Sequence, residues 1–276
     1  FPKVWREIKR ENSWLKRIVA EYSIDVVISD NRFGLYCKNA QCIFITHQLF
    51  IKTGNWLTEK IAQKINYKFI NRFDSCRVPD QPAEQNLAGD LSHPRTMPLV
   101  PVKYIGILSR FEKSAGNRKH TNILIMLSGP EPQRTLFENI LLPQLKESDL
   151  KIILVRGLPG IVKGIDFSGI NVTSFNHLSG KELEDLILSA DTIIARSGYT
   201  TVMELAALQK KAILVPTPGQ KEQEYLAAYL SAKEYCIAED QKDFDLYAAL
   251  NQLTTSEKIS CRLPQQNMLR DLISEL

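Results

Sequence analysis

The sequence has no long apolar stretch, no internal repeat and no segment of low complexity. Its longest apolar runs, such as 123–127 and 152–155, have the length of a strand, whereas a helix needs roughly 20 apolar residues to span a bilayer. We therefore predict no transmembrane helix. The chain starts at Phe1 with a stretch that is charged throughout, unlike a signal peptide with its apolar centre. We expect either a fragment or a sequence whose true start has been left out.

Cysteine is scarce, and its spacing matches neither a metal site nor a disulfide framework. The five cysteines are scattered, odd in number and without CxxC pairs. They are Cys37, Cys42, Cys76, Cys236 and Cys261. Most lie in apolar, strand-like runs, so we expect reduced and buried thiols in a cytosolic protein.

Positive charge is present but is not clustered with aromatic residues as it is in nucleic-acid-binding modules. The net charge is +4, and the part through Tyr104 is the more basic one, with 16 Lys and Arg against 10 Asp and Glu. We predict no nucleic-acid partner.

Strand-like and helical patterns alternate along the first hundred residues. A helical pattern over 3–22 leads to a buried strand at 24–29, a second strand at 42–46, an amphipathic helix at 56–73 and a short strand at 75–78. The strands are apolar along their whole length, which predicts a parallel sheet covered on both faces.

A second alternation starts at Thr121, after a proline-rich and polar stretch at 80–119 that indicates a domain boundary. Six further strands alternate with helices, and a last helix is expected at the C-terminus. The sequence therefore predicts an α/β protein of two Rossmann-like, doubly wound domains. We place the first at 1–105, incomplete at its N-terminus, the second at 106–262, and a C-terminal helix at 263–276 that could pack back on the first domain.

The most informative segment is a strand-to-helix junction in the second domain. A buried strand ends at Arg196, Gly198 lets a ligand approach the backbone, and Thr200 or Thr201 would cap the next helix. The positive end of the helix dipole suits a diphosphate, and the carboxylate of Glu204 could accept both hydroxyls of a ribose. An ordinary turn followed by a solvated Glu204 would fit the same residues.

Two neighbouring loops supply matching polar groups. After the next strand, Gln223 and Glu224 open another helix and would face the same crevice, where they could bind sugar hydroxyls. Ser128 and Gly129 follow the first strand of this domain as a second candidate phosphate cradle, or as an ordinary turn.

The segment 193–230 resembles the donor site of glycosyltransferases of the family 28 type, which have the GT-B fold. The likeness lies in an Arg-Ser-Gly segment, a Glu six residues after its Gly, and a Gln-rich helix start after a Val-Pro strand end. It implies a donor nucleotide site formed by Arg196, Ser197, Gly198, Tyr199, Thr200, Thr201 and Glu204, with Gln223 and Glu224 at the donor sugar. Two departures put the identity of that sugar in doubt: Glu224 stands where relatives tend to have a second Gln, and Ala227 where some have Asn.

The resemblance extends more weakly into the first domain. The segment 42–63 is similar to one in which a strand ends in a His-containing loop that faces the cleft, and this places His47, with Gln48, near the acceptor. Asp30 ends the preceding strand. Both are candidates for the general base, although a structural role for His47 is an equal alternative and the base could lie in a segment before Phe1. Without that segment the polypeptide could bind donor and not turn it over.

The resemblance implies an inverting transfer of a hexose or N-acetylhexosamine from a UDP-sugar to a cell-envelope or lipid-linked acceptor, without a cofactor. No Asp-x-Asp pair that would hold Mg²⁺ lies near the site, so we predict metal independence, with helix amides stabilising the leaving diphosphate. Two alternatives stay open: a nucleotide-sugar hydrolase or epimerase of this architecture, and a non-catalytic nucleotide-sugar-binding protein.

The basic first domain suggests a further partner. Two of its helices carry lysines and arginines, at 6–17 and 60–68, which could rest on anionic lipid or form ordinary solvated faces. We expect a cytoplasmic protein, peripheral on the inner face of the cytoplasmic membrane.

Overall fold

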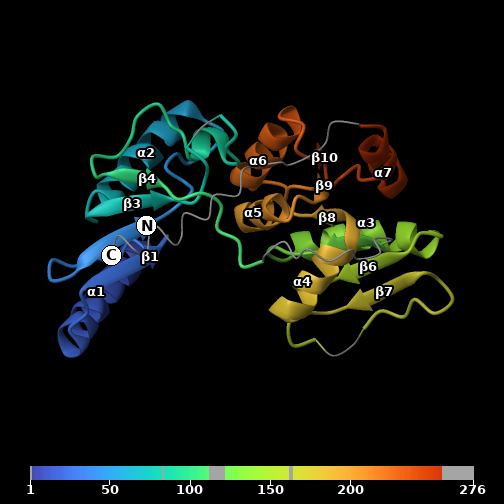
Figure 1. Cartoon of the computed structure of the whole chain (residues 1–276), viewed down its shortest axis with the longest axis horizontal. Helices are drawn as coiled ribbons and strands as arrows, with labels where there is room; N and C mark the ends of the chain where they lie inside the picture. Colours follow the sequence, from blue (N-terminus) through green and yellow to red (C-terminus); the bar gives the residue numbers. More distant parts are fainter. Residues whose placement is uncertain (1, 83, 112–121, 162–163, 257–276) are drawn as a thin grey trace. The chain divides into compact units, whose positions relative to one another are not determined.

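The computed structural model describes residues 2–82, 84–111, 122–161 and 164–256 (Figure 1). These residues form two units, one that ends at Leu108 and one that begins at Ser109. The helix expected at 263–276 lies outside the described residues. No helix in the described ranges is both long and apolar enough to cross a membrane.

The first unit is a parallel sheet with the strand order β1-β2-β3-β4. Its elements are α1 (Pro2–Tyr22), β1 (Val26–Asp30), β2 (Gln41–Ile45), α2 (Trp56–Ile70), β3 (Ser75–Val78), the 3₁₀ turn η1 (Gly89–Leu91) and β4 (Val102–Tyr104). Helix α1 turns Leu15 and Val19 into a core that includes Phe44 of β2 and Ile70 of α2. The apolar spacing of α1 therefore predicted its buried side.

Helix α2 packs differently from the expectation that its apolar residues share one face. Phe69 and Ile70 are buried, but Leu57, Ile61 and Ile65 are exposed. Apolar periodicity locates a stripe on a helix and does not say what covers it. In α2 the contacts with the core come from the last turn.

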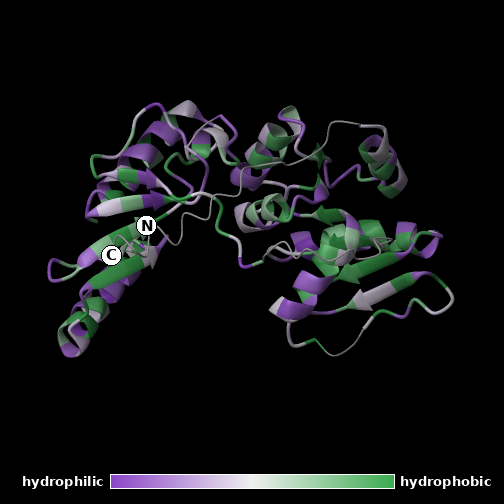
Figure 2. Ribbon diagram, in the orientation of Figure 1, coloured by the Kyte–Doolittle hydropathy of each residue, from purple (hydrophilic) through white to green (hydrophobic). Residues whose placement is uncertain are grey.

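The second unit is a parallel sheet with the strand order β10-β9-β8-β5-β6-β7. Its elements are β5 (Asn122–Met126), α3 (Gln133–Lys146), β6 (Ile152–Val155), β7 (Val172–Phe175), α4 (Gly180–Ser189), β8 (Ala190–Ala195), α5 (Tyr199–Ala207), β9 (Lys211–Leu214), α6 (Lys221–Ala232), β10 (Ile237–Ala238) and α7 (Leu246–Thr255). Most strands of both sheets are hydrophobic, and the helices carry both characters (Figure 2). This pattern confirms the prediction of parallel sheets inside an α/β fold.

Helix α7 was missed by the sequence analysis. It begins at Leu246, after Asp245 caps it by accepting a hydrogen bond from the amide of Ala248. The side chain of Gln144 on α3 fixes its start, because it accepts from the amide of Leu246 and donates to the carbonyl of Phe244. A contact about a hundred residues distant in sequence leaves no local signal.

Strands β5 and β8 are neighbours at the centre of this sheet, and the chain leaves them in opposite directions. From β5 it continues to β6 and β7, and from β8 to β9 and β10. Such a reversal opens a crevice at the carboxyl ends of the two strands, where ligands bind in open α/β sheets. The loops after β5, β8 and β9 all reach this edge.

The loop after β6 contains a position that requires glycine. Gly157 has φ +67°, and a Cβ atom there would lie 2.3 Å from the carbonyl oxygen of Leu127. We expect Gly157→Ala to lower the free energy of unfolding by about 2 kcal/mol or more, because both the backbone strain and the clash oppose it. Urea unfolding measures the loss. The control is Gly164→Ala, which meets nothing within 4 Å; equal stability of the two variants would contradict this account.

Candidate functional site

Three loops converge at the edge of the second sheet where β5, β8 and β9 end. A Cβ atom on Gly129, after β5, would lie 3.5 Å from the hydroxyl of Thr217, after β9. The hydroxyl of Ser197, after β8, donates to the carbonyl of Gln223 on α6 at 2.8 Å. The structure thus brings together the sequence-predicted turns at Ser128 and Gly129, at 196–198 and at the start of α6.

Arg196 braces this edge from a buried position. The residue is 2% exposed, and its guanidinium donates to the carbonyls of Val215, Pro216 and Gln133 and to the side chain of Gln241. It also lies over the ring of Phe137. Burial lowers the pKa of Arg196 to about 10. Four acceptors and a ring surround the two terminal amino groups, whereas Nε has no hydrogen-bond partner among the described residues. The role of Arg196 in donor binding stays a prediction.

The junction between β8 and α5 leaves backbone donors open. Gly198 is the N-cap of α5, in an extended conformation, and no side-chain bond caps the helix. The first turn of α5 carries no acidic residue. Amides at such an end have no partner within the helix and attract an anion.

The side chains at this junction take roles that differ from the expected ones. Thr200 and Thr201 lie inside the first turn of α5 and do not cap it, because the helix already begins at Tyr199. Ser197 and Tyr199 are buried, whereas Thr200 is exposed. Since the Ser197 hydroxyl is engaged by α6, Gly198 and the threonines are the accessible part of the junction.

Glu204 is buried on α5 and is held by an arginine from the start of the second unit. Its side chain is 7% exposed, and one carboxylate oxygen lies 2.6 Å from Nε of Arg110. Burial raises the pKa of Glu204, and the hydrogen bond from Arg110 opposes that rise. The alternative of a solvated glutamate is wrong. Sequence analysis missed Arg110, which is 94 residues from its partner.

The raised pKa of Glu204 makes stability depend on pH in a defined direction. A carboxyl group whose pKa is higher in the folded state stabilises the fold fully below its unfolded pKa, and that contribution is lost as pH rises through the folded value. We expect the wild-type protein to gain unfolding free energy relative to Glu204→Gln as pH falls from about 7.5 to about 4.5. Urea titrations of both proteins at several pH values check this; a difference that is constant with pH would contradict it.

The start of α6 is a self-contained network around Gln223 and Glu224. The amide oxygen of Gln223 accepts from the backbone of Thr217 at 2.9 Å, and its amide nitrogen donates to Gln220. Glu224 accepts from the backbone of Gly219 and pairs with Lys221, whose hydrogen bond lowers the pKa of Glu224. Both residues reach the predicted edge, where they shape the loop.

Thr217 is a site residue that the sequence analysis overlooked. Its side-chain oxygen is buried beside the Gly129 turn and has no hydrogen-bond partner among the described residues. An unpaired buried hydroxyl costs free energy, and a threonine between two prolines carries no motif that would mark it.

In the first unit, the two candidate bases lie at one edge of the sheet. Asp30 is the last residue of β1 and pairs in register with Ile45 of β2, two residues before His47. Asp30 is exposed and His47 is half-buried. Their catalytic roles stay predictions.

His93, in the loop that precedes β4, is packed against its neighbours. Its ring stacks on Tyr104 and its Nε2 lies 3.7 Å from the buried carboxylate of Asp80. That carboxylate also accepts hydrogen bonds from the backbone of Leu87 and Ala88. Among the described residues, no group of three or more His, Cys, Asp or Glu side chains is placed to hold a metal ion.

The sequence and the structure of this chain are similar to those of known glycosyltransferases. Residues 145–274 match the model of the glycosyltransferase family 28 C-terminal domain. A UDP-N-acetylglucosamine–N-acetylmuramyl-(pentapeptide) pyrophosphoryl-undecaprenol N-acetylglucosamine transferase of Histophilus somni is 24% identical over 262 residues, which cover 88% of this chain and 68% of the relative. The solved structure of Acinetobacter baumannii MurG matches with a TM-score of 0.57 at 15% identity, over 98% of this chain and 78% of that one. Residues 145–274 therefore belong to the glycosyltransferase family 28 C-terminal domain family, and the chain as a whole is similar to GT-B glycosyltransferases of this type.

Two further similar proteins show how far these comparisons extend. The transferase of the same name from Sulfurihydrogenibium is 28% identical, but the match covers 50% of this chain and 39% of the relative. A putative UDP-N-acetylglucosamine 2-epimerase from Listeria monocytogenes has a TM-score of 0.59 at 10% identity, over 99% of this chain and 79% of that one. This likeness shows the shared fold alone.

Proposed function

We propose that this chain binds a UDP-sugar at the edge formed by β5, β8 and β9. We further propose that it transfers the hexose or N-acetylhexosamine, with inversion and without a metal ion, to a lipid-linked acceptor. The observation that carries the proposal is the pairing of an uncapped α5 start with a buried carboxylate, Glu204, on the same helix. The names of the curated relatives support the same donor and acceptor classes.

Each part of the donor would meet a different group of this edge. The amides at Gly198, Thr200 and Thr201 would receive the diphosphate and stabilise the charge that develops as it leaves. Glu204 would accept hydrogen bonds from the ribose hydroxyls, which requires the ribose to compete with Arg110. Gln223 and Glu224 would contact the sugar from the start of α6.

The acceptor hydroxyl needs a general base, which we assign to the first unit. His47 and Asp30 stand at the carboxyl edge of its sheet, where acceptor groups are expected in this fold. Removing the proton as the hydroxyl attacks the anomeric carbon from the face opposite the diphosphate would give an inverted product.

Product analysis tests the proposed reaction and separates it from its rivals. The protein is incubated with UDP-N-acetylglucosamine and a polyprenyl-diphosphate-linked sugar, with EDTA or with Mg²⁺. We expect a new glycoside and free UDP, in equal amounts under both conditions. Free sugar alone would indicate a hydrolase, an epimerised nucleotide sugar an epimerase, and a requirement for Mg²⁺ would contradict the metal-independent mechanism.

We also propose that the first unit rests on an anionic membrane surface, on its cytoplasmic side, where a lipid-linked acceptor would be presented. Trp56, Leu57 and Ile61 of α2 are more than half exposed, and Lys60 lies over the ring of Trp56 on the same helix, with Lys64 one turn further on. Apolar side chains interleaved with lysines favour an interfacial helix. The lysines also line a pocket of about 510 Å³ with Lys52 and Arg95.

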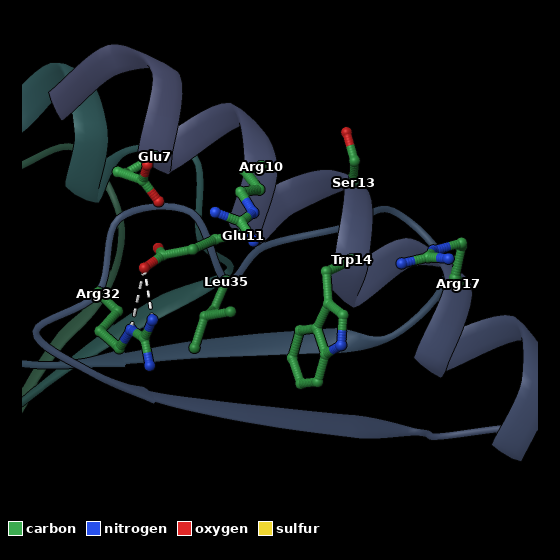
Figure 3. Close-up of a pocket in the computed structure, with 8 residues that line it drawn as sticks. All are labelled: Glu7, Arg10, Glu11, Ser13, Trp14, Arg17, Arg32 and Leu35. Atoms are coloured by element: carbon green, nitrogen blue, oxygen red, sulfur yellow. Dashed lines mark hydrogen bonds and ion pairs between the residues drawn. The ribbon is translucent and has the colours of Figure 1, made fainter. Parts of the chain in front are cut away.

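Helix α1 adds a second basic and aromatic surface to this unit. A groove of about 620 Å³ runs along this helix. Arg10, Trp14 and Arg17 of the helix line it (Figure 3). Arg32 and Glu11 also line this groove, and they form an ion pair at 2.5 Å. Two arginines beside an exposed tryptophan suit the headgroup region of a bilayer.

Replacing Ile61 by serine is expected to weaken binding to vesicles that contain anionic phospholipid by roughly tenfold or more, because a buried Ile side chain contributes about 1.5–3 kcal/mol. Sedimentation with anionic and with neutral vesicles measures it. Leu136→Ser, at an exposed position of α3, is the matched control. Unchanged binding of Ile61→Ser, or equal binding to neutral vesicles, would contradict the membrane contact.

A further inference from the structure

The connection between β1 and β2 crosses from one parallel strand to the next without a helix. Residues 31–40 lie beneath α1, where the side-chain amide of Asn12 donates to the carbonyls of Gly34 and Tyr36. Phe33 stacks on Phe44 of β2. Side chains and not a helical hydrogen-bond ladder therefore hold this crossover in place.

Two thiols meet where the crossover joins β2. The Sγ atoms of Cys37 and Cys42 lie 3.9 Å apart, and the backbone amide of Cys37 donates to Sγ of Cys42 at 3.2 Å. Cys42 is fully buried, whereas Cys37 is half-buried and reachable from solvent. Both are free thiols. The sulfurs are in van der Waals contact, so a modest movement of the Cys37 side chain closes them to the roughly 2.05 Å of a disulfide.

We propose that Cys37 and Cys42 are a redox-sensitive pair that a hydroperoxide converts into a disulfide. The accessible Cys37 sulfur attacks the peroxide oxygen, the O–O bond breaks, and Cys37 becomes a sulfenic acid while the peroxide leaves as water or an alcohol. The Cys42 sulfur then attacks the Cys37 sulfur. The S–S bond forms, and the sulfenic hydroxyl leaves with the Cys42 proton as water. Two thiols are oxidised and one hydroperoxide is reduced.

The exposure of Cys37 and the burial of Cys42 determine which thiol reacts first and how fast the disulfide forms. Solvent reaches Cys37 first, and the buried Cys42 sulfur lies against the Cys37 sulfur. Burial raises the pKa of Cys42 to about 11, so few Cys42 thiolates exist at neutral pH and the second step accelerates as pH rises. The disulfide would tie the crossover to the start of β2, and an added thiol would reduce it again.

The test uses the full chain, reduced and then treated with one equivalent of hydrogen peroxide. We expect the intact mass to fall by two hydrogen atoms, peptide mapping to recover a Cys37–Cys42 cross-link, and dithiothreitol to restore both thiols. Melting of the oxidised chain should occur at a higher temperature than that of the reduced chain, because the cross-link restricts the unfolded state.

Three variants assign the chemistry to the pair. Cys42→Ser should stop at a sulfenic acid on Cys37, which a dimedone probe captures, whereas Cys37→Ser should form neither species. Cys76→Ser, which removes another buried thiol, should cross-link as the wild type does. A cross-link between other cysteines, a covalent dimer, or oxidation of Cys37 to a sulfinic acid in the wild type without any cross-link would each overturn the proposal.

Discussion

Replacing Glu204 by glutamine is expected to weaken the binding of UDP by roughly 10- to 150-fold while the protein stays folded. A hydrogen bond to a charged group is worth about 1.5–3 kcal/mol, which corresponds to that range in Kd. The amide of glutamine can accept through one oxygen only, so it cannot hold both ribose hydroxyls. Isothermal titration with UDP measures the loss.

Two controls separate the loss of a ligand contact from a change of fold. Glu147→Gln, at the exposed end of α3, removes a carboxylate from the same unit and should leave UDP affinity unchanged. Titration with inorganic pyrophosphate should be equal for Glu204→Gln and the wild type, because the diphosphate is assigned to the α5 amides. Wild-type UDP affinity in Glu204→Gln would refute the ribose contact.

Replacing Arg196 by methionine is expected to lower the free energy of unfolding by at least about 3 kcal/mol, which is a large part of the stability of a domain. Methionine keeps much of the side-chain length but donates to none of the acceptors that Arg196 serves. The carbonyls of Val215 and Pro216 would be left buried without these donors, and each such group costs about 1–3 kcal/mol. Urea unfolding of the full chain measures the change.

The same variant distinguishes a brace from a ligand contact. If Arg196 holds the loops together, the folded fraction of Arg196→Met should retain the UDP affinity of the wild type within a few-fold. Lys242→Met, which removes an exposed cation beside Gln241, should change neither quantity. A variant of normal stability that fails to bind UDP would show that Arg196 contacts the nucleotide after all.

The strands of the second unit could be predicted because each carries its own signal. β5, β6 and β8 are continuous apolar runs between polar turns, which is the pattern of strands buried on both faces. The edge at which they end follows from parallel topology, so the approximate location of the site could also be predicted. Helix α7 could not, because its start depends on Gln144 of a distant helix.

The roles of individual side chains depended on contacts that a sequence does not display. Arg196 at the end of a strand resembles a ligand-binding arginine, and only the structure shows the acceptors that surround it. No residue close to Glu204 in the sequence accounts for its burial. Its partner Arg110 precedes β5, 94 residues earlier in the chain. The exposure of the apolar residues of α2 could likewise not be predicted, because it depends on which elements pack against the helix.

We expect the second unit to hold UDP with the diphosphate at the start of α5 and the ribose at Glu204. A crystal structure of the chain soaked with UDP tests it most directly. We predict phosphate oxygens within hydrogen-bond distance of the amides at 198–201, both ribose hydroxyls on the Glu204 carboxylate, and Arg110 released from that carboxylate. UDP bound elsewhere, or a ribose away from an intact Arg110–Glu204 pair, would contradict the account.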